Sequence, residues 1–446
     1  MPPPCLHPAF RSFCARLAFP LLVTAASAQT APPPPLDAVA SDPVKMGWMV
    51  GSPPPPEKIF KFSDGSFRSF PQSRWAYAHI REFVPTRAVS RGNSPVTPLP
   101  RAERDDLDAI TFFPAGSDRP MTWAQSLLAN YTDGILVLHR GQVVYERYFG
   151  VLTPSRQHIA FSVTRSLVGT LAAALVAEGA LDEAALVARY VPELRDSGFG
   201  DAAVRQIMDM TVGIKYSEAY TDPKADHWDF NRAGGWLPRP VGEQGPGSFY
   251  GYLPSIQKER SHGDVFAYKT PNANVLGWIM HRATGKSIGD LLEERIWSKL
   301  GAEEDAYFTV DSTGTEHSGG GLNLTLRDLA RFGEMIRLSG RFHGRQIVPR
   351  AAIDGIRRGG NPEHFAKAGY KARPGWSYRN MWWISHDSHG HFSARGIHGQ
   401  GIYIYPVAEM VVVRFASHPA ASTANHDPTM LPAFEALARH LARAAR

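Results

Sequence analysis

The sequence has very little cysteine: Cys5 and Cys14 are the only two in 446 residues. Both lie in the first 28 residues, which carry Arg11 and Arg16, no acidic residue, and the apolar run LAFPLLVTAASA. Basic residues before a short apolar run that ends in small residues are typical of a cleaved secretory signal. We therefore expect cleavage after Ala28 and a periplasmic or secreted mature chain. It would have no disulfide, thiolate metal site or cysteine nucleophile.

The rest of the chain lacks both long apolar runs and charge clusters. No later segment reaches the ~20 apolar residues that a membrane-spanning helix requires. The formal charge of +6 comes from 48 basic and 42 acidic residues that are scattered along the chain. Neither a membrane span nor a nucleic-acid partner is expected. With 43% hydrophobic and 11% aromatic residues, the chain can bury a large core.

The start of the mature chain is rich in proline. The runs APPPP at 31–35 and SPPPP at 52–56 exclude a helix or a central strand there. We predict that residues 29–104 form an extended segment packed on a main domain of residues 105–446. The aromatic residues expected to dock this segment are Trp48, Phe60, Phe62, Phe67, Phe70 and Trp75.

Strand and helix signals divide the main domain. β-rich runs on either side of turn residues predict hairpins at 134–150 and 401–417. Apolar residues at helical spacing from Val163 to Leu175, followed by Gly179 as a cap, predict a helix that begins beside Ser162. We expect an α+β fold with one antiparallel sheet flanked by helices. An inserted helical subdomain is expected at about residues 180–300.

Three separated clusters carry residues suited to catalysis: SVTR at 162–165, YKTPN at 268–272 and GIHGQG at 396–401. A serine at the first turn of a helix has an unpaired backbone N–H, and the helix dipole stabilises negative charge there. Ser162 is therefore a candidate nucleophile, although an ordinary N-cap serine has the same pattern. The sequence contains no Gly-x-Ser-x-Gly motif, so an α/β-hydrolase is not supported.

The order and spacing of these clusters resemble serine hydrolases of the class C β-lactamase and D,D-peptidase family. The resemblance is strongest to the 6-aminohexanoate-dimer (nylon-oligomer) hydrolase branch, near the family VIII carboxylesterases. It extends from about residue 43 to the C-terminus and includes MGWMVGSPPPP, DGILVLHRGQVVYERYFG, MDMTVGIKYSEAYTDP, FAYKTPNANVLGWIM and RGIHGQGIYIYP. It implies a β-lactamase-like fold, no cofactor, and an ester or amide of a small carboxylic acid as substrate, cleaved through an acyl-enzyme.

The resemblance also implies roles for single residues. Ser162 would be the nucleophile and Tyr268 would relay protons to the leaving group. The backbone N–H groups of Ser162 and Ile397 would form the oxyanion hole. Further residues would line or contact the substrate pocket: Tyr220, Thr270, His398, and Trp383 or its neighbour Trp382.

The sequence departs from the family at Arg165, where relatives have a lysine that accepts the serine proton. A guanidinium keeps its proton in proteins, so Arg165 cannot be the base. We hypothesise that it acts as a fixed cation: at about 4 Å and an effective dielectric near 20, it favours a phenolate at Tyr268 by roughly 4 kcal/mol. His398 is a second candidate base. The alternative is a binding protein on the same fold that has lost its base.

Three other patterns are weaker. Ser255 and Lys258 have Ser-x-x-Lys spacing but no apolar helix after them. Lys269 adjoins Tyr268, but in an extended segment it points to the opposite face. The histidines of SHDSHGHF match no metallohydrolase signature, and we predict a polar turn there rather than a metal site: His386, His389 and His391, with Asp387.

Overall fold

The computed structural model describes residues 34–370 and 373–443. The predicted signal at residues 1–28, with both cysteines, lies outside the described residues. Within the described part, none of the helices combines the length and apolar character that a membrane crossing requires.

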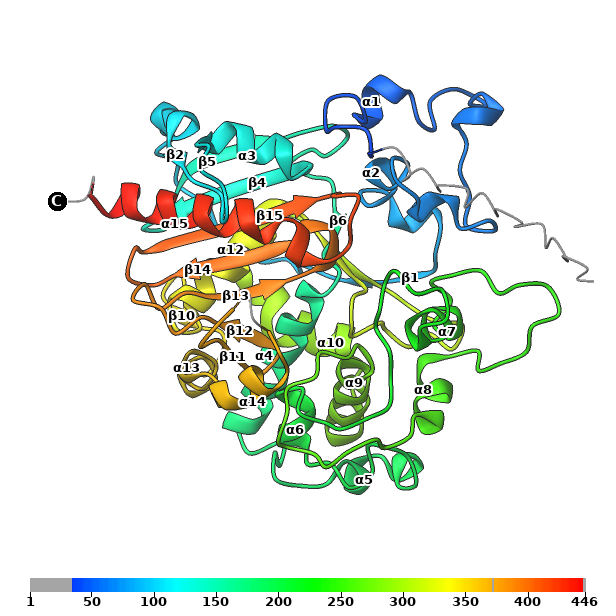
Figure 1. The fold of residues 1–446 in the computed structure, drawn as a ribbon. Helices are drawn as coiled ribbons and strands as arrows, with labels where there is room; N and C mark the ends of the chain where they lie inside the picture. Colours follow the sequence, from blue (N-terminus) through cyan, green and yellow to red (C-terminus); the bar gives the residue numbers. More distant parts are fainter. Residues whose placement is uncertain (1–33, 371–372, 444–446) are drawn as a thin grey trace, which may run out of the picture. The chain divides into compact units, whose positions relative to one another are not determined.

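A seven-stranded antiparallel sheet forms the centre of the domain (Figure 1). Its strand order is β11-β12-β13-β14-β15-β4-β5. The two predicted hairpins are β4 with β5 and β14 with β15, and Val412 pairs with Val137 where they join. The strands are β4 (Thr132–His139), β5 (Gln142–Tyr148), β11 (Ser377–Arg379), β12 (Trp382–Ile384), β13 (Phe392–Arg395), β14 (Gly401–Tyr405) and β15 (Met410–Ala416).

The central strands read as continuous apolar runs because both faces of the sheet are buried. In β4, Leu136 and Leu138 pack into one core cluster and Ile135 and Val137 into another. The first core contains the helices α4 (Val163–Ala177) and α12 (Leu326–Arg337). The second lies under α15 (Asp427–Arg443), the red helix of Figure 1. The predicted α+β fold is confirmed.

A second sheet was not expected. It has four strands in the order β1-β7-β8-β6. Its strand β6 directly precedes Ser162 and the helix that follows it. Its strands have two to four residues each, too few for an alternating pattern to stand out. They are β1 (Thr86–Val89), β6 (His158–Ile159), β7 (Ala306–Thr309) and β8 (Leu322–Leu324). Two short hairpins complete the strands: β2 (Thr111–Phe112) with β3 (Met121–Thr122), and β9 (Arg341–Phe342) with β10 (Arg345–Gln346).

The chain between α4 and β7 contains helices separated by irregular segments. They are α5 (Val187–Tyr190), α6 (Val204–Met208), α7 (Asp226–Ala233), α8 (Phe249–Tyr252), α9 (Pro271–Thr284), α10 (Ile288–Leu292), a π-helical turn (Glu293–Trp297) and α11 (Ser298–Leu300). The remaining α-helices are α1 (Pro43–Met46), α2 (Ser73–Ala76), α3 (Trp123–Ala129), α13 (Arg350–Arg358) and α14 (Pro362–Lys367). As predicted, α4 begins directly after Ser162, and Gly179 follows its C-cap with φ of 74°.

The segment before the main domain contains short helices, irregular chain and strand β1, which pairs with β7 in the second sheet. Its aromatic residues form a buried cluster that includes Trp48, Phe60, Phe67 and Trp75. Phe67 is fully buried and stacks on Phe83 with ring centroids 4.8 Å apart. These contacts fix the backbone on both sides of Phe67.

Gly169 in α4 has no room for a side chain. A Cβ placed there would lie 2.7 Å from the Cβ of Met381 and even closer to the Asn380 carbonyl. We expect Gly169→Ala to lower the free energy of unfolding by about 1–3 kcal/mol through overpacking. Gly355 is the matched control in α13, since its Cβ would meet nothing nearer than 3.8 Å. Gly355→Ala should be stabilising by about 0.5–1 kcal/mol. Urea unfolding measures both, and equal effects would contradict the packing described.

Candidate active site

Ser162 sits at the junction between β6 and α4. The preceding residue, Phe161, has a φ of 42°, which turns the chain abruptly from strand to helix. Such a conformation costs a non-glycine residue about 1–3 kcal/mol and persists only where surrounding contacts hold it. Phe161 is held by an edge contact with Tyr77, with ring centroids 4.9 Å apart. The packed turn at Phe161 therefore fixes the position of Ser162, which lines a cavity.

Two backbone N–H groups near Ser162 have no acceptor among the described residues: its own and that of Ile397. Ile397 opens a short 3-10 helix (Ile397–Gly399) after β13, and His398 within it has a φ of 60°. Gly396 brings the two segments together. A Cβ at Gly396 would lie 2.8 Å from the Ala160 carbonyl oxygen and 3.2 Å from the Ser162 nitrogen. The missing side chain leaves room in front of the Ser162 N–H.

Arg165 lies one turn along α4 and is 2% exposed. Its guanidinium carbon lies 4.4 Å from the centroid of the Tyr268 ring. Its Nη2 contacts the Thr270 hydroxyl and lies 3.5 Å from Glu218 Oε1. Among the described residues, Nε and Nη1 have no hydrogen-bond partner. The guanidinium is thus a buried cation between the nucleophile helix and the Tyr268 loop.

Glu218 balances this cation, although its sequence context does not predict this role. Its carboxylate accepts hydrogen bonds from the Thr270 backbone and hydroxyl, both at 2.6 Å, and from the Tyr220 hydroxyl at 2.7 Å. Burial alone would raise the pKa of Glu218, but Arg165 and these hydrogen bonds hold that pKa below its usual value. Burial likewise opposes the charge of Arg165, but the electrostatic influence of its neighbours, including the Glu218 carboxylate, raises its pKa. Both members of the pair are therefore ionised.

The cavity in front of Ser162 has a volume of about 870 Å³. Tyr220, Tyr268 and Trp383 line it, together with Ile397. Trp383, rather than Trp382, faces the cavity. The indole N–H of Trp382 instead points into the core and donates to the Ser166 carbonyl at 3.1 Å.

Two residues expected to contact substrate are placed differently. His398 is not among the residues that line the cavity: its Nδ1 lies 2.7 Å from the His418 carbonyl oxygen and its ring packs on Tyr77 and Phe161. Burial lowers the pKa of His398 to about 4, so the ring is neutral. Thr270 is 2% exposed and binds Arg165 and Glu218. His398 and Thr270 therefore contact other residues of the site and its surroundings rather than the cavity itself.

Residues 125–432 match the family model described as Beta-lactamase. The chain belongs to the β-lactamase family. A 6-aminohexanoate-dimer hydrolase of Paenarthrobacter ureafaciens is 36% identical over 359 residues, which cover 80% of this chain and 88% of that protein. A Bacillus anthracis structure assigned as a 6-aminohexanoate-dimer hydrolase has a TM-score of 0.78 at 31% identity, covering 86% of this chain and 99% of that one. The predicted family is confirmed.

A class C β-lactamase in complex with cefoxitin shares the fold alone, with a TM-score of 0.51 at 16% identity over 70% of this chain and 95% of that one. With the family established, the protein is a serine hydrolase of the β-lactamase type.

The weaker sequence patterns lie outside this site of the β-lactamase fold. Ser255 is exposed and donates to the Tyr252 carbonyl at 2.7 Å, while Lys258 pairs with Asp201. Lys269 Nζ binds Glu259 Oε1 at 2.8 Å and does not line the cavity.

The histidines of the 386–391 turn do not converge on a common point. His386 Nε2 lies 2.7 Å from the Ser377 hydroxyl, whereas His391 is buried and its Nδ1 lies 3.8 Å from Asp387. Within residues 34–370 and 373–443, no group of three or more His, Cys, Asp or Glu side chains is arranged to hold a metal ion.

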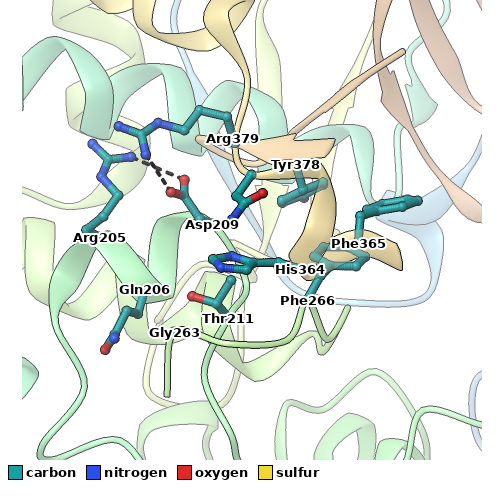
Figure 2. A pocket seen from close by; sticks show the side chains of 12 residues that line it. Arg205, Gln206, Asp209, Thr211, Gly263, Phe266, His364, Phe365, Tyr378 and Arg379 are labelled. Carbon is teal, nitrogen blue, oxygen red and sulfur yellow. Dashed lines mark hydrogen bonds and ion pairs between the residues drawn. The ribbon is translucent and has the colours of Figure 1, made fainter. Parts of the chain in front are cut away.

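A second cavity of about 290 Å³ lies elsewhere on the domain. Figure 2 shows the guanidinium groups of Arg205 and Arg379 next to each other and both directed at the Asp209 carboxylate, with Tyr378 and Phe365 to the right in this view. Arg379 lies 2.8 Å from Asp209, and Arg205 also pairs with Glu183. Because these charges compensate one another, the second cavity holds no free charge for a ligand.

The ion pair of Glu218 and Arg165 should stabilise the fold in a pH-dependent way. Glu218→Gln is expected to lower the free energy of unfolding at neutral pH by about 3–5 kcal/mol, because it leaves Arg165 buried without an anion. The folded-state pKa of Glu218 lies below its usual value of 4.5, so the pair contributes fully above that pH and is lost as pH falls through the lower folded value. The difference between the two proteins should therefore shrink only as the pH falls below 4.5.

The matched control is Asp182→Asn, which removes the exposed ion pair with Arg189 at 3.0 Å. It should cost less than about 1 kcal/mol in the same urea titrations. Equal losses in the two variants would contradict the importance assigned to the buried pair.

Proposed function

We propose that the protein is an exported serine hydrolase that cleaves an ester or amide bond of a small carboxylic acid through an acyl-enzyme on Ser162. The observation that carries this proposal is that Ser162 and Ile397 line one cavity and that, within residues 34–370 and 373–443, neither of their backbone N–H groups has an acceptor. Two such donors stabilise the oxyanion of a tetrahedral intermediate. Export rests on the sequence of residues 1–28 alone.

Tyr268 is proposed as the residue that moves protons. As a phenolate it accepts the Ser162 proton while Oγ bonds to the substrate carbonyl carbon, and it then gives that proton to the leaving nitrogen or oxygen. In deacylation it accepts a proton from water, which attacks the acyl carbon, and returns it to Ser162. Arg165 holds a permanent positive charge 4.4 Å from the Tyr268 ring centroid and so favours the anionic phenol.

The substrate class is supported by the relatives rather than by the fold. The 36% identical relative is named for hydrolysis of 6-aminohexanoate dimer, which has an amide bond. The cavity of about 870 Å³ is large enough for a compact molecule of this kind. We therefore propose short amides or esters as substrates. The alternative, a binding protein that has lost its base, is favoured by Arg165 alone.

Covalent labelling tests the nucleophile directly. Intact-protein mass after exposure to a fluorophosphonate, and separately to a p-nitrophenyl ester, should show one adduct on the native protein and none on Ser162→Ala. Arg165→Lys should label as well, since either cation suits the site. Labelling that requires Arg165→Lys would mean that the native chain has lost its chemistry. Complete absence of labelling would contradict the assignment of Ser162.

Gly396→Ala tests the oxyanion hole. Its Cβ would lie 3.2 Å from the Ser162 nitrogen, where the substrate oxygen is proposed to bind. We expect kcat to fall on the order of 100-fold, the cost of losing one oxyanion donor. Gly247→Ala is the control, because its Cβ would meet nothing nearer than 3.8 Å. Steady-state hydrolysis of a p-nitrophenyl ester measures both, with thermal unfolding to establish that Gly396→Ala is folded. An unchanged kcat would exclude the oxyanion position proposed.

A further inference from the structure

Arg68 brings a positive charge to the active site from outside the family domain. It is the last residue of a short 3-10 helix (Ser66–Arg68), and it directly follows the fully buried Phe67. Phe67 stacks on Phe83 and meets the edge of Trp236, with ring centroids 4.8 and 6.0 Å away. These contacts fix the direction in which the Arg68 side chain leaves the backbone.

The guanidinium of Arg68 has no counter-charge. Its central carbon lies 5.8 Å from the ring centroids of both Trp228 and Trp236. Among the described residues, no carboxylate lies within 4.0 Å and no acceptor is hydrogen-bonded to it, and its Nη1 is buried. Burial lowers the pKa of Arg68, but a guanidinium remains charged at any physiological pH. The Arg68 side chain is half-buried, and a bound anion would supply the buried Nη1 with the partner that the described residues do not provide.

Arg68 lines a small recess of about 30 Å³ that adjoins the main cavity. The recess and the cavity share Ser162, Tyr220 and Ile397. One bound water needs about 10–15 Å³ in the same measure, so the recess has room for about two oxygen-sized atoms. A carboxylate group has that size.

The charges around the recess favour an anion. Arg68 and Arg165 both line it, and Glu218 compensates only Arg165. The two histidines in its wall are neutral, because burial lowers the pKa of His227 to about 4 and that of His317 to about 3. The recess therefore has an excess of one positive charge beside the nucleophile.

The other arginines of the cavity differ in this respect. Arg373 and Arg395 both pair with Asp427 at the start of α15. Their guanidinium groups therefore share one carboxylate, which also lines the cavity. Arg68 differs from them because, among the described residues, no carboxylate lies within 4.0 Å of its guanidinium.

We propose that this recess, with Arg68 as its anchor, binds a carboxylate carried by the substrate within a few bonds of the scissile carbonyl. The inference rests on the proposed function and specifies its substrate class: monoesters or monoamides with a second, free carboxylate. That carboxylate belongs either to the acyl half or to the leaving half of the substrate. Arg68 is then a specificity-determining residue, and it lies outside the matched residues 125–432.

Matched substrates separate recognition from chemistry. For the acyl half, mono-p-nitrophenyl glutarate is compared with p-nitrophenyl pentanoate; for the leaving half, 4-acetoxybenzoate is compared with phenyl acetate. Arg68→Met should lower kcat/KM at least about tenfold for one of the two anionic esters, as expected for a lost charged hydrogen bond. The neutral esters should change less than about twofold, and Arg68→Lys should recover part of the loss.

Arg81→Met is the control variant. Arg81 belongs to the same N-terminal segment and also lies over an aromatic ring, 3.9 Å from the centroid of Tyr307, but it is not part of the recess. Its removal should affect anionic and neutral esters alike. Equal losses for both classes of ester in Arg68→Met, or no loss in either, would overturn the proposal.

A binding measurement keeps the inference independent of turnover. Calorimetric titration of monomethyl glutarate and of 4-acetoxybenzoate into Ser162→Ala should detect binding of at least one of them, and adding Arg68→Met should weaken it at least about tenfold. If the native protein fails to label or turn over but this difference is found, the recess is an anion site of a binding protein and only the proposed catalysis fails. If neither compound binds more tightly with Arg68 present, the anion site itself is wrong.

Discussion

The buried charge of Arg165 is the constraint on which the rest of the active site depends. A guanidinium that is 2% exposed must be balanced, because an isolated buried charge is far more costly than a paired one. Glu218 provides the balance, and its remaining lone pairs are satisfied by Thr270 and Tyr220. One ion pair therefore joins α4, the start of α9 and the segment around residue 220. The nucleophile, the Tyr268 loop and one wall of the cavity share this single anchor.

The same charge decides how catalysis is divided among the residues. A lysine at position 165 could lose its proton and act as base, whereas an arginine supplies only a fixed positive field. In the mechanism that we propose, proton transfer then falls to Tyr268, over whose ring the guanidinium lies. His398 is not among the residues that line the cavity, and its Nδ1 lies 2.7 Å from the His418 carbonyl oxygen. In the proposed mechanism, one phenol therefore has both the general-acid and the general-base role.

How far sequence predicts this structure depends on how local each signal is. The hairpins of β4 with β5 and β14 with β15 are predictable because strands buried on both faces leave long apolar runs. The strands of the second sheet are too short to leave any pattern. The position of Ser162 follows from its apolar helix. The direction of His398 does not, because a φ of 60° turns its side chain away from the face that an extended strand would give it.

Glu218 and Arg68 escape prediction for a different reason. Each has meaning only through charge balance in three dimensions, and nothing in the local sequence distinguishes Glu218 among 42 acidic residues or Arg68 among 48 basic ones. In the folded chain their surroundings differ. Glu218 neutralises Arg165 of α4, whereas no described side chain neutralises Arg68. Arg68 is positioned by Phe67 within an aromatic cluster that precedes the family domain. The N-terminal segment therefore sets the electrostatic balance of a site whose chemistry the family domain supplies.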